Sequence, residues 1–364
     1  MDILIASFLS SLVAVLWVVR SSRGNSGRGL DSDQDGPQKF HARPVPRIGG
    51  VGLLVGLLAG AAWMWFTKVG GNTPLLIIGC GLPAFLAGLT EDMTRRINPT
   101  VRLIATLISA LLASWLVGAT IRHAALPGLD FLLAIPTLSV LLTAFAVAGV
   151  ANSFNIIDGF NGLASMCSAM MLACLAYVAF QVGDQELGYL AIVGCGAVLG
   201  FFVWNFPAGL IFLGDGGAYL LGFFVAEVAV LLIGRHPEVS PGFPLLLCAY
   251  PIFETLFSIY RKKYLRGSSA TVPDGVHLHM LVYKRLMRWM VGSRDARHLT
   301  RRNSMTSPYL WMLCSMSVVP AALWWRQTWV MFTCIVLFAA MYCLLYWRIV
   351  RFRVPRWMVV RAKS

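Results

Sequence analysis

The sequence has few charged residues for its length. Only 13% of its 364 residues are Asp, Glu, Lys or Arg, whereas 58% are hydrophobic. A water-soluble domain of this size would need far more polar surface to cover its core. Many stretches of about eighteen or more residues carry no charge, and that length crosses the hydrocarbon core of a bilayer. The composition therefore excludes a soluble domain and predicts a polytopic membrane protein.

The sequence also lacks the cysteine patterns of disulfide-rich or metal-binding proteins. Its eight cysteines form no Cys-x-x-Cys pair, and all lie in apolar segments. Such cysteines are typical of small packing residues, so we expect neither a disulfide framework nor a thiolate metal site. Segment 1–19 has no basic region before its apolar run, which favours a first spanning helix over a signal peptide.

Hydropathy predicts one all-α domain over 1–364, a bundle of about eleven transmembrane helices. Helices are expected because lipid offers the backbone no hydrogen-bond partners. The expected ranges are 2–19, 48–67, 74–90, 101–117, 131–149, 164–181, 188–205, 218–233, 243–260, 309–325 and 329–347.

The basic residues predict the orientation of this bundle. Most of the 30 Lys and Arg residues fall on one side, which is therefore expected to be cytoplasmic, with the N-terminus outside and the C-terminus inside. The net charge of +14 then reflects topology and contact with anionic lipids, and no nucleic-acid partner is expected. The expected cytoplasmic segments are 20–47, 91–100, 150–163, 206–217, 261–308 and the tail 348–364.

Acidic residues are scarce, yet four of them lie at the predicted cytoplasmic edge on three separate segments. Glu91 and Asp92 occur in GLTEDMTRR, Asp158 in NSFNIIDGFNGLA, and Asp215 in FLGDGGAYLLGF. Carboxylates at a membrane edge are costly unless they gain a cation or a partner. Hard oxygen ligands beside basic residues suit Mg²⁺ on a diphosphate, whereas zinc would want a His or Cys cluster. Solvation of loop ends is the alternative explanation for each motif taken alone.

Two further motifs are basic. His277 and His279 form a His-x-His pair in VPDGVHLHML, and KFHARPVPRIGG contributes Lys39 and other cations before the second expected helix. Flanking cations would let the histidine pair bind phosphate oxygens. An exposed pair without a role, and a basic loop that merely leads into a helix, remain the alternatives for these two motifs.

The ordered set of five motifs resembles the polyprenyl-phosphate N-acetylhexosamine-1-phosphate transferases of glycosyltransferase family 4. The motifs run from Lys39 to Leu281, which covers most of the chain. The sequence HLHM lacks the run of three histidines of the peptidoglycan lipid I synthase branch. The resemblance is therefore closer to the branch that initiates bacterial O-antigen with N-acetylglucosamine 1-phosphate.

This resemblance implies a reaction in which undecaprenyl phosphate attacks the sugar-bearing phosphorus of a UDP-sugar and UMP leaves, with Mg²⁺ or Mn²⁺ as cofactor. Its position in the motifs makes Asp215 the expected metal ligand. The expected catalytic residues are Glu91, Asp92 and Asp158. The expected nucleotide-binding residues are Asn155, Asn161 and Phe212, and those for phosphate or substrate are Lys39, Arg95, His277 and His279.

Four positions depart from the family pattern. Glu91 and Glu254 stand where the family usually has Asp, Asn161 replaces an acid, and Met280 replaces a histidine. These departures indicate a divergent branch and leave open another sugar donor. They also keep open a non-catalytic family member, and intramembrane Glu227 and Glu254 keep open a transporter or flippase for a lipid-linked anion. A homodimer is compatible with the sequence, and a bacterial inner membrane is the expected location.

Overall fold

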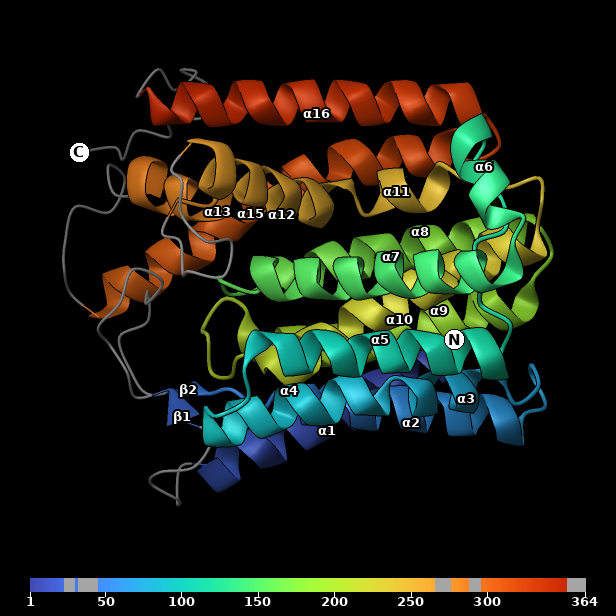
Figure 1. Cartoon of the computed structure of the whole chain (residues 1–364). Helices are drawn as coiled ribbons and strands as arrows, with labels where there is room; N and C mark the ends of the chain where they lie inside the picture. Colours follow the sequence, from blue (N-terminus) through green and yellow to red (C-terminus); the bar gives the residue numbers. More distant parts are fainter. Residues whose placement is uncertain (23–29, 32–44, 266–275, 288–295, 352–364) are drawn as a thin grey trace.

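The computed structural model describes residues 1–22, 30–31, 45–265, 276–287 and 296–351. Long helices run side by side along one direction in this part of the chain (Figure 1). The helices are α1 (Asp2–Ser22), α2 (Gly50–Phe66), α3 (Thr73–Cys80), α4 (Leu82–Thr94), α5 (Pro99–Leu116), α6 (Pro127–Leu133), α7 (Pro136–Ile157), α8 (Leu163–Gln181), α9 (Gln185–Asn205), α10 (Gly214–Arg235), α11 (Phe243–Leu247), α12 (Ala249–Tyr260), α13 (Leu278–Leu281), α15 (Ala296–Leu323) and α16 (Thr328–Val350).

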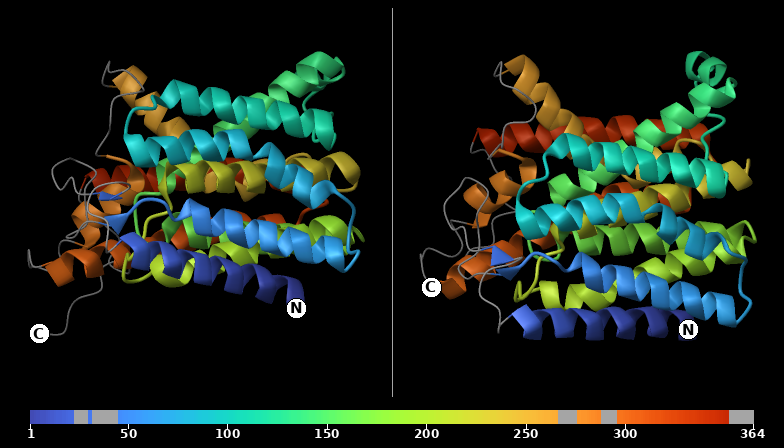
Figure 2. Two further views of the ribbon diagram at one scale, coloured as in Figure 1. Left: turned by 90° about the horizontal axis from the view of Figure 1, so that it is seen from below. Right: turned by 60° about the horizontal axis from the view of Figure 1, so that its bottom comes forward.

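Short elements gather at one end of this bundle. The strands β1 (Leu30–Asp31) and β2 (Val45–Pro46) form an antiparallel pair, a small exception to the all-α expectation. Two π-helical turns, η1 (Arg261–Leu265) and η2 (Val282–Met287), follow α12 and α13. The strand pair and α13 lie at one end of the bundle and α6 at the other (Figure 1). The N-terminus lies at the end away from the strands (Figure 2).

The helices identify a multi-pass membrane protein. Within the described residues, seven helices are long and apolar enough to cross a bilayer, or eight if α3 and α4, bent by 40°, count as one span. The other expected segments coincide with α2, which has 17 residues, with the broken pair α11–α12, and with α15, whose first half is polar. The predicted total of eleven spans therefore stays a prediction.

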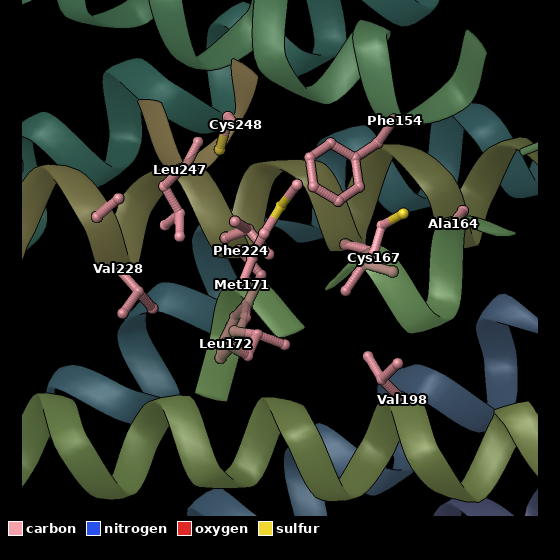
Figure 3. Packing of buried hydrophobic residues seen from close by; sticks show 14 of the residues in the cluster. Phe154, Ala164, Cys167, Met171, Leu172, Val198, Phe224, Val228, Leu247 and Cys248 are labelled. Atoms are coloured by element: carbon pink, nitrogen blue, oxygen red, sulfur yellow. The ribbon is translucent and has the colours of Figure 1, made fainter. Parts of the chain in front are cut away.

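Helix α10 forms the centre of the bundle. Nearly all of its side chains are buried, and it packs against α2, α4, α7, α8 and α9. A helix that is apolar on every face is expected inside such a bundle. In Figure 3, Phe154 of α7, Met171 of α8 and Phe224 of α10 lie in this packed interior.

Close backbone contact brings α4 up to the beginning of α10. A Cβ on Gly88 of α4 would lie only 2.5 Å from the backbone nitrogen of Gly216, so this crossing requires a glycine. Helix α2 meets α10 in the same way, through Gly50 and Gly217. Both contacts fall at the end of the bundle that carries the strand pair, and they fix three helices around one point.

Several predicted loop boundaries are wrong. The segment 150–163 begins inside α7, which continues to Ile157 because its polar residues contact α10 instead of solvent. Residues 91–94 belong to α4 and 214–217 to α10, since capping contacts extend both helices past their apolar cores. The segment 261–308 includes η1, α13, η2 and the first half of α15, which pack on the bundle.

Candidate active site

Two carboxylates cap the N-terminus of α10. Asp92 of α4 accepts the backbone N–H of Asp215 through Oδ1 and that of Gly216 through Oδ2, both at 2.9 Å. Asp158, directly after α7, accepts the backbone N–H of Gly214. The first N–H groups of a helix have no partner within the helix and carry partial positive charge. Acids from two other helices therefore meet at the beginning of α10.

Backbone hydrogen bonds attach the segment before α2 to the segment before α10. The N–H of Phe212 donates to the carbonyl of Pro46 at 2.8 Å, and the N–H of Gly49 donates to Phe212 at 3.0 Å. The N–H of Gly50 donates to Leu213 at 2.9 Å. Phe212 is partly buried and leads directly into the capped helix terminus. These bonds hold residue 47, which lies between Pro46 and Gly49, against the acids.

Two arginines balance the acids. The guanidinium of Arg47 lies 3.6 Å from Asp215 and 3.9 Å from Asp92. Arg102 of α5 pairs with the second carboxylate oxygen of Asp215. The side chains of Asp92, Asp215 and Arg102 are largely buried, so water screens these charges little. We call Arg47, Asp92, Arg102, Asp158 and Asp215 the charged cluster.

A tyrosine joins the charged cluster to the asparagines of α7. The guanidinium of Arg102 lies 5.8 Å from the ring centre of Tyr219. The Tyr219 hydroxyl donates to Asn152 Oδ1 at 3.1 Å, and the Asn155 side chain also hydrogen-bonds Tyr219. Asn155 therefore lies beside the cluster, on the same face of α7 as Asn152, as residues three apart on a helix should.

Burial changes the acidity of Asp158. It raises the pKa of the Asp158 carboxyl from 3.8 to about 7, although the positive charge of Arg47 and the N–H of Gly214 act in the opposite direction. Taking a carboxylate out of water penalises its charged form, which is the cause of this rise. Asp158 is therefore poised to change charge near neutral pH.

Glu91 and Arg95 lie in their own turn and not in the charged cluster. Glu91 Oε2 accepts the backbone N–H of Ile97 at 2.7 Å, which closes the turn between α4 and α5. Arg95 occupies the left-handed region, with φ of 55°, and its side chain is exposed. The adjacent acids Glu91 and Asp92 therefore have different surroundings, and the structure separates Glu91 from the other predicted catalytic residues.

Asn161 is used inside the protein. Its backbone N–H donates to Asn303 of α15 at 2.8 Å, and its side-chain amide donates to Ser304 at 3.2 Å and to the carbonyl of Pro207 at 3.3 Å. Ser307 donates to the Asn161 carbonyl at 2.6 Å. Asn161 is 3% exposed. In this arrangement it joins the loop after α7 to α15.

The two histidines of HLHM are also buried. His277 and His279 stack with ring centres 5.2 Å apart and planes 4° apart. Both point Nδ1 toward Glu254 of α12, at 3.3 and 3.7 Å. Burial lowers the pKa of His279 to about 4, so its imidazole is neutral at pH 7. The histidines thus lie next to the loop after α7 but face inward.

Lys39 lies outside the described residues. Within those residues, no group of three or more His, Cys, Asp or Glu side chains is arranged to hold a metal ion. Mg²⁺, however, is usually bound by one or two carboxylates together with substrate phosphates and water. The oxygen donors of Asp215 and its neighbours in the charged cluster fit that mode of binding.

Sequence reasoning missed two members of the charged cluster. Arg47, one of the cations of KFHARPVPRIGG, and Arg102 were not predicted as site residues, and Tyr219 was not considered. Arg102 could have been predicted to have a partner, because it lies near the start of an otherwise apolar helix, where a charged side chain normally forms an ion pair. Arg47 stands in PRIGG, one of the quoted motifs.

Known membrane transferases are similar to this chain in sequence. Residues 74–233 match the model of glycosyl transferase family 4. The chain is 27% identical over 280 residues to the probable undecaprenyl-phosphate N-acetylglucosaminyl 1-phosphate transferase of Bacillus subtilis (strain 168), covering 76% of each chain. It is 25% identical over 257 residues to the undecaprenyl-phosphate alpha-N-acetylglucosaminyl 1-phosphate transferase of Thermotoga maritima, covering 71% of this chain and 74% of the relative. It is 28% identical over 214 residues to the phospho-N-acetylmuramoyl-pentapeptide-transferase of Geobacillus thermodenitrificans, covering 56% of this chain and 66% of the relative.

The multi-pass bundle, the charged cluster at one end and the matched relatives define the class of membrane-embedded phosphoglycosyltransferases. Within that class, residues 74–233 are similar to glycosyl transferase family 4.

Proposed function

We propose that the protein transfers N-acetylhexosamine 1-phosphate from a UDP-sugar to undecaprenyl phosphate, releasing UMP and forming undecaprenyl-diphosphate-sugar. The observation that carries this proposal is the charged cluster, in which acids and arginines meet at the N-terminus of a buried helix. The names of the B. subtilis and T. maritima relatives support N-acetylglucosamine as the sugar.

The charged cluster has the chemistry that phosphoryl transfer needs. Two anions must approach each other, so catalysis depends mainly on charge neutralisation and positioning. Arg47 and Arg102 supply positive charge for phosphate oxygens. A lipid phosphate monoester has a second pKa of about 6, so no strong base is required. Asp92 then acts by holding α10, and Asp158 is the acid best placed to orient the attacking phosphate.

Mg²⁺ or Mn²⁺ is the proposed cofactor, and Asp215 is the residue that would hold it. When bound, such an ion neutralises negative charge on the diphosphate. Asp158 keeps its own contact with α10, through the backbone N–H of Gly214. Phe212, next to the helix terminus, is the proposed contact for the uracil ring. Asn155 would bind the nucleotide from α7.

The proposed topology has eleven crossings, with the N-terminus outside and both the site and the C-terminus at the cytoplasmic face. Contacts of the short helices support this count. Arg47 before α2 and Asp92 at the end of α4 meet at α10, so the chain between them must run out along α2 and back along α3–α4. A 17-residue helix is about 26 Å long, close to the hydrocarbon thickness.

The same reasoning applies to the C-terminal helices. Glu254 of α12 contacts Leu278 at the site end, whereas the preceding α10 ends at Arg235 on the other side. Asn303 of α15 reaches the loop after α7, and the backbone N–H of Ser240 donates to Trp325 just beyond α15 at the far end. The pair α11–α12 and helix α15 are therefore proposed to cross as well.

The proposed location is the cytoplasmic membrane of a bacterium, and the proposed role is the first step of a cell-surface polysaccharide such as O-antigen. The test is UMP release by purified protein supplied with undecaprenyl phosphate, Mg²⁺ and a panel of UDP-sugars, beside an Asp215→Asn control. We expect UMP and a lipid-diphosphate-sugar from one donor only when lipid and metal are present. A folded wild-type protein that forms neither product from any donor would refute the proposal.

A further inference from the structure

A second polar group lies inside the same end of the bundle, next to the charged cluster. It consists of Glu254 on α12 and the stacked pair His277 and His279 at α13. Glu254 is 1% exposed and His279 is fully buried. Burying a carboxylate at such a place is costly unless other groups are oriented toward it. The arrangement therefore needs an explanation beyond packing.

One carboxylate oxygen of Glu254 lies close to three nitrogen atoms of the histidine motif. Its Oε1 accepts the backbone N–H of Leu278 at 2.7 Å, and it lies 3.3 Å from His277 Nδ1 and 3.7 Å from His279 Nδ1. Since His279 is neutral at pH 7, it carries a single ring proton. A carboxylate facing Nδ1 favours the proton on that nitrogen and leaves Nε2 as an acceptor.

The far side of His279 lies against the loop that carries Asp158. A Cβ added to Gly159 would be 3.4 Å from His279 Nε2. The ring also meets Phe160 edge to face, with centres 5.6 Å apart. His279 is therefore packed between Glu254 on one side and the residues directly after Asp158 on the other.

We propose that Glu254 is a positioning residue, which fixes the ring orientation of His277 and His279 and, through His279, the position of the turn at Asp158 and Gly159. The inference rests on the proposed function only in taking Asp158 as part of the active site. Glu254 itself touches no reacting atom in this arrangement. The resemblance implies Asp at this position. The longer side chain of Glu254 would place its carboxylate oxygen between the rings of His277 and His279.

The ring protons provide a test that needs no substrate. Nitrogen-15 labelling of the six histidines reports by NMR, for each imidazole, which nitrogen carries the proton. Variants His277→Asn and His279→Asn assign the two resonances. In the wild type we expect both rings to carry the proton on Nδ1. Finding all six histidines as Nε2–H forms would overturn the proposal even if no variant folded.

The variant Glu254→Gln removes the charge and keeps the shape. We expect it to change the resonances of His277 and His279, and to lower kcat about tenfold with little change in the KM for UDP-sugar, the loss typical of one charge-assisted hydrogen bond. Glu254→Asp keeps the charge and should retain more activity than Glu254→Gln. The matched control is Glu227→Gln, another fully buried carboxyl, on α10, which should leave both histidine resonances unchanged.

Unchanged histidine resonances in folded Glu254→Gln would refute the positioning role. Equal activity loss in Glu254→Gln and Glu254→Asp would also count against it, because that result would assign the effect to packing. If the wild type released no UMP at all, the proposed function would fall, while the ring-proton measurement would still decide the inference about Glu254.

Discussion

The position of Asp92 leads to a sharp prediction about stability. Both of its carboxylate oxygens accept backbone N–H groups of α10, from Asp215 and Gly216. The substitution Asp92→Asn leaves one acceptor and turns an amide donor toward the other N–H. It also removes a negative charge from the positive end of the helix. The variant should therefore lose stability as well as activity.

The size of the effect follows from these contacts. A hydrogen bond to a charged group contributes about 1.5–3 kcal/mol. The interaction of a charge with a helix terminus adds about 0.3–1 kcal/mol at exposed sites and up to about 2 kcal/mol when partly buried. Losing one bond and the charge should cost roughly 2–4 kcal/mol of unfolding free energy. Arg47, 3.9 Å from Asp92, would also lose part of its counter-charge.

The neighbouring acid supplies the matched control. Glu91 accepts one backbone N–H, from Ile97, in a partly exposed turn. Glu91→Gln can keep that bond and should cost no more than about 1 kcal/mol. Thermal unfolding in detergent and UMP release would be measured on both variants. If Asp92→Asn lost activity but melted at the wild-type temperature, Asp92 would act directly in the reaction and the capping argument would be wrong.

Three further predictions concern single positions. Asn161→Asp removes the amide that donates to the Pro207 carbonyl and places a carboxylate oxygen against that carbonyl oxygen. The free energy of unfolding should fall by about 1–3 kcal/mol and the Tm should fall with it, so an unchanged Tm would contradict the contact. Arg47→Gln removes a charge that lowers the pKa of Asp158, so the rise of kcat/KM near pH 7 should move to higher pH; a shift to lower pH would exclude Asp158 as the titrating group. Glu227→Gln should retain the wild-type Tm and turnover, because both oxygens of this buried carboxyl lack a partner and a neutral group suits that site; a large loss of turnover would indicate a role in the reaction.

Apolar runs predicted the positions of the helices but not their ends. The expected helix 131–149 ends before Asn152 and Asn155. Both asparagines instead contact Tyr219 of α10, so the helix continues to Ile157. A polar residue in a membrane helix can form its hydrogen bonds with a neighbouring helix, and the sequence alone does not show which helix that is.

The motifs predicted that acids from separate segments lie near one another, but not which groups each acid contacts. Glu91 and Asp92 are adjacent, and their order in the chain could not separate them. A helix turns by about 100° per residue, so adjacent side chains face different neighbours. Only the packing of α4 on α10 showed that Asp92 faces the cluster. The partner of Asn161, Asn303, is 142 residues away, which no local pattern reveals.

Three of the residues that depart from the family pattern make contacts within the protein. Glu91 closes its own turn, Asn161 binds α15, and Glu254 faces the two histidines. None of the three lies among the residues that cap α10 or pair with its first acid. A non-catalytic protein would be expected to lose the charged cluster first, because its buried charges are costly to keep without a ligand to bind. Here Asp92 and Asp215 are present together with Arg47 and Arg102, and the three departures make contacts outside the charged cluster. That distribution favours an active enzyme whose supporting contacts have diverged.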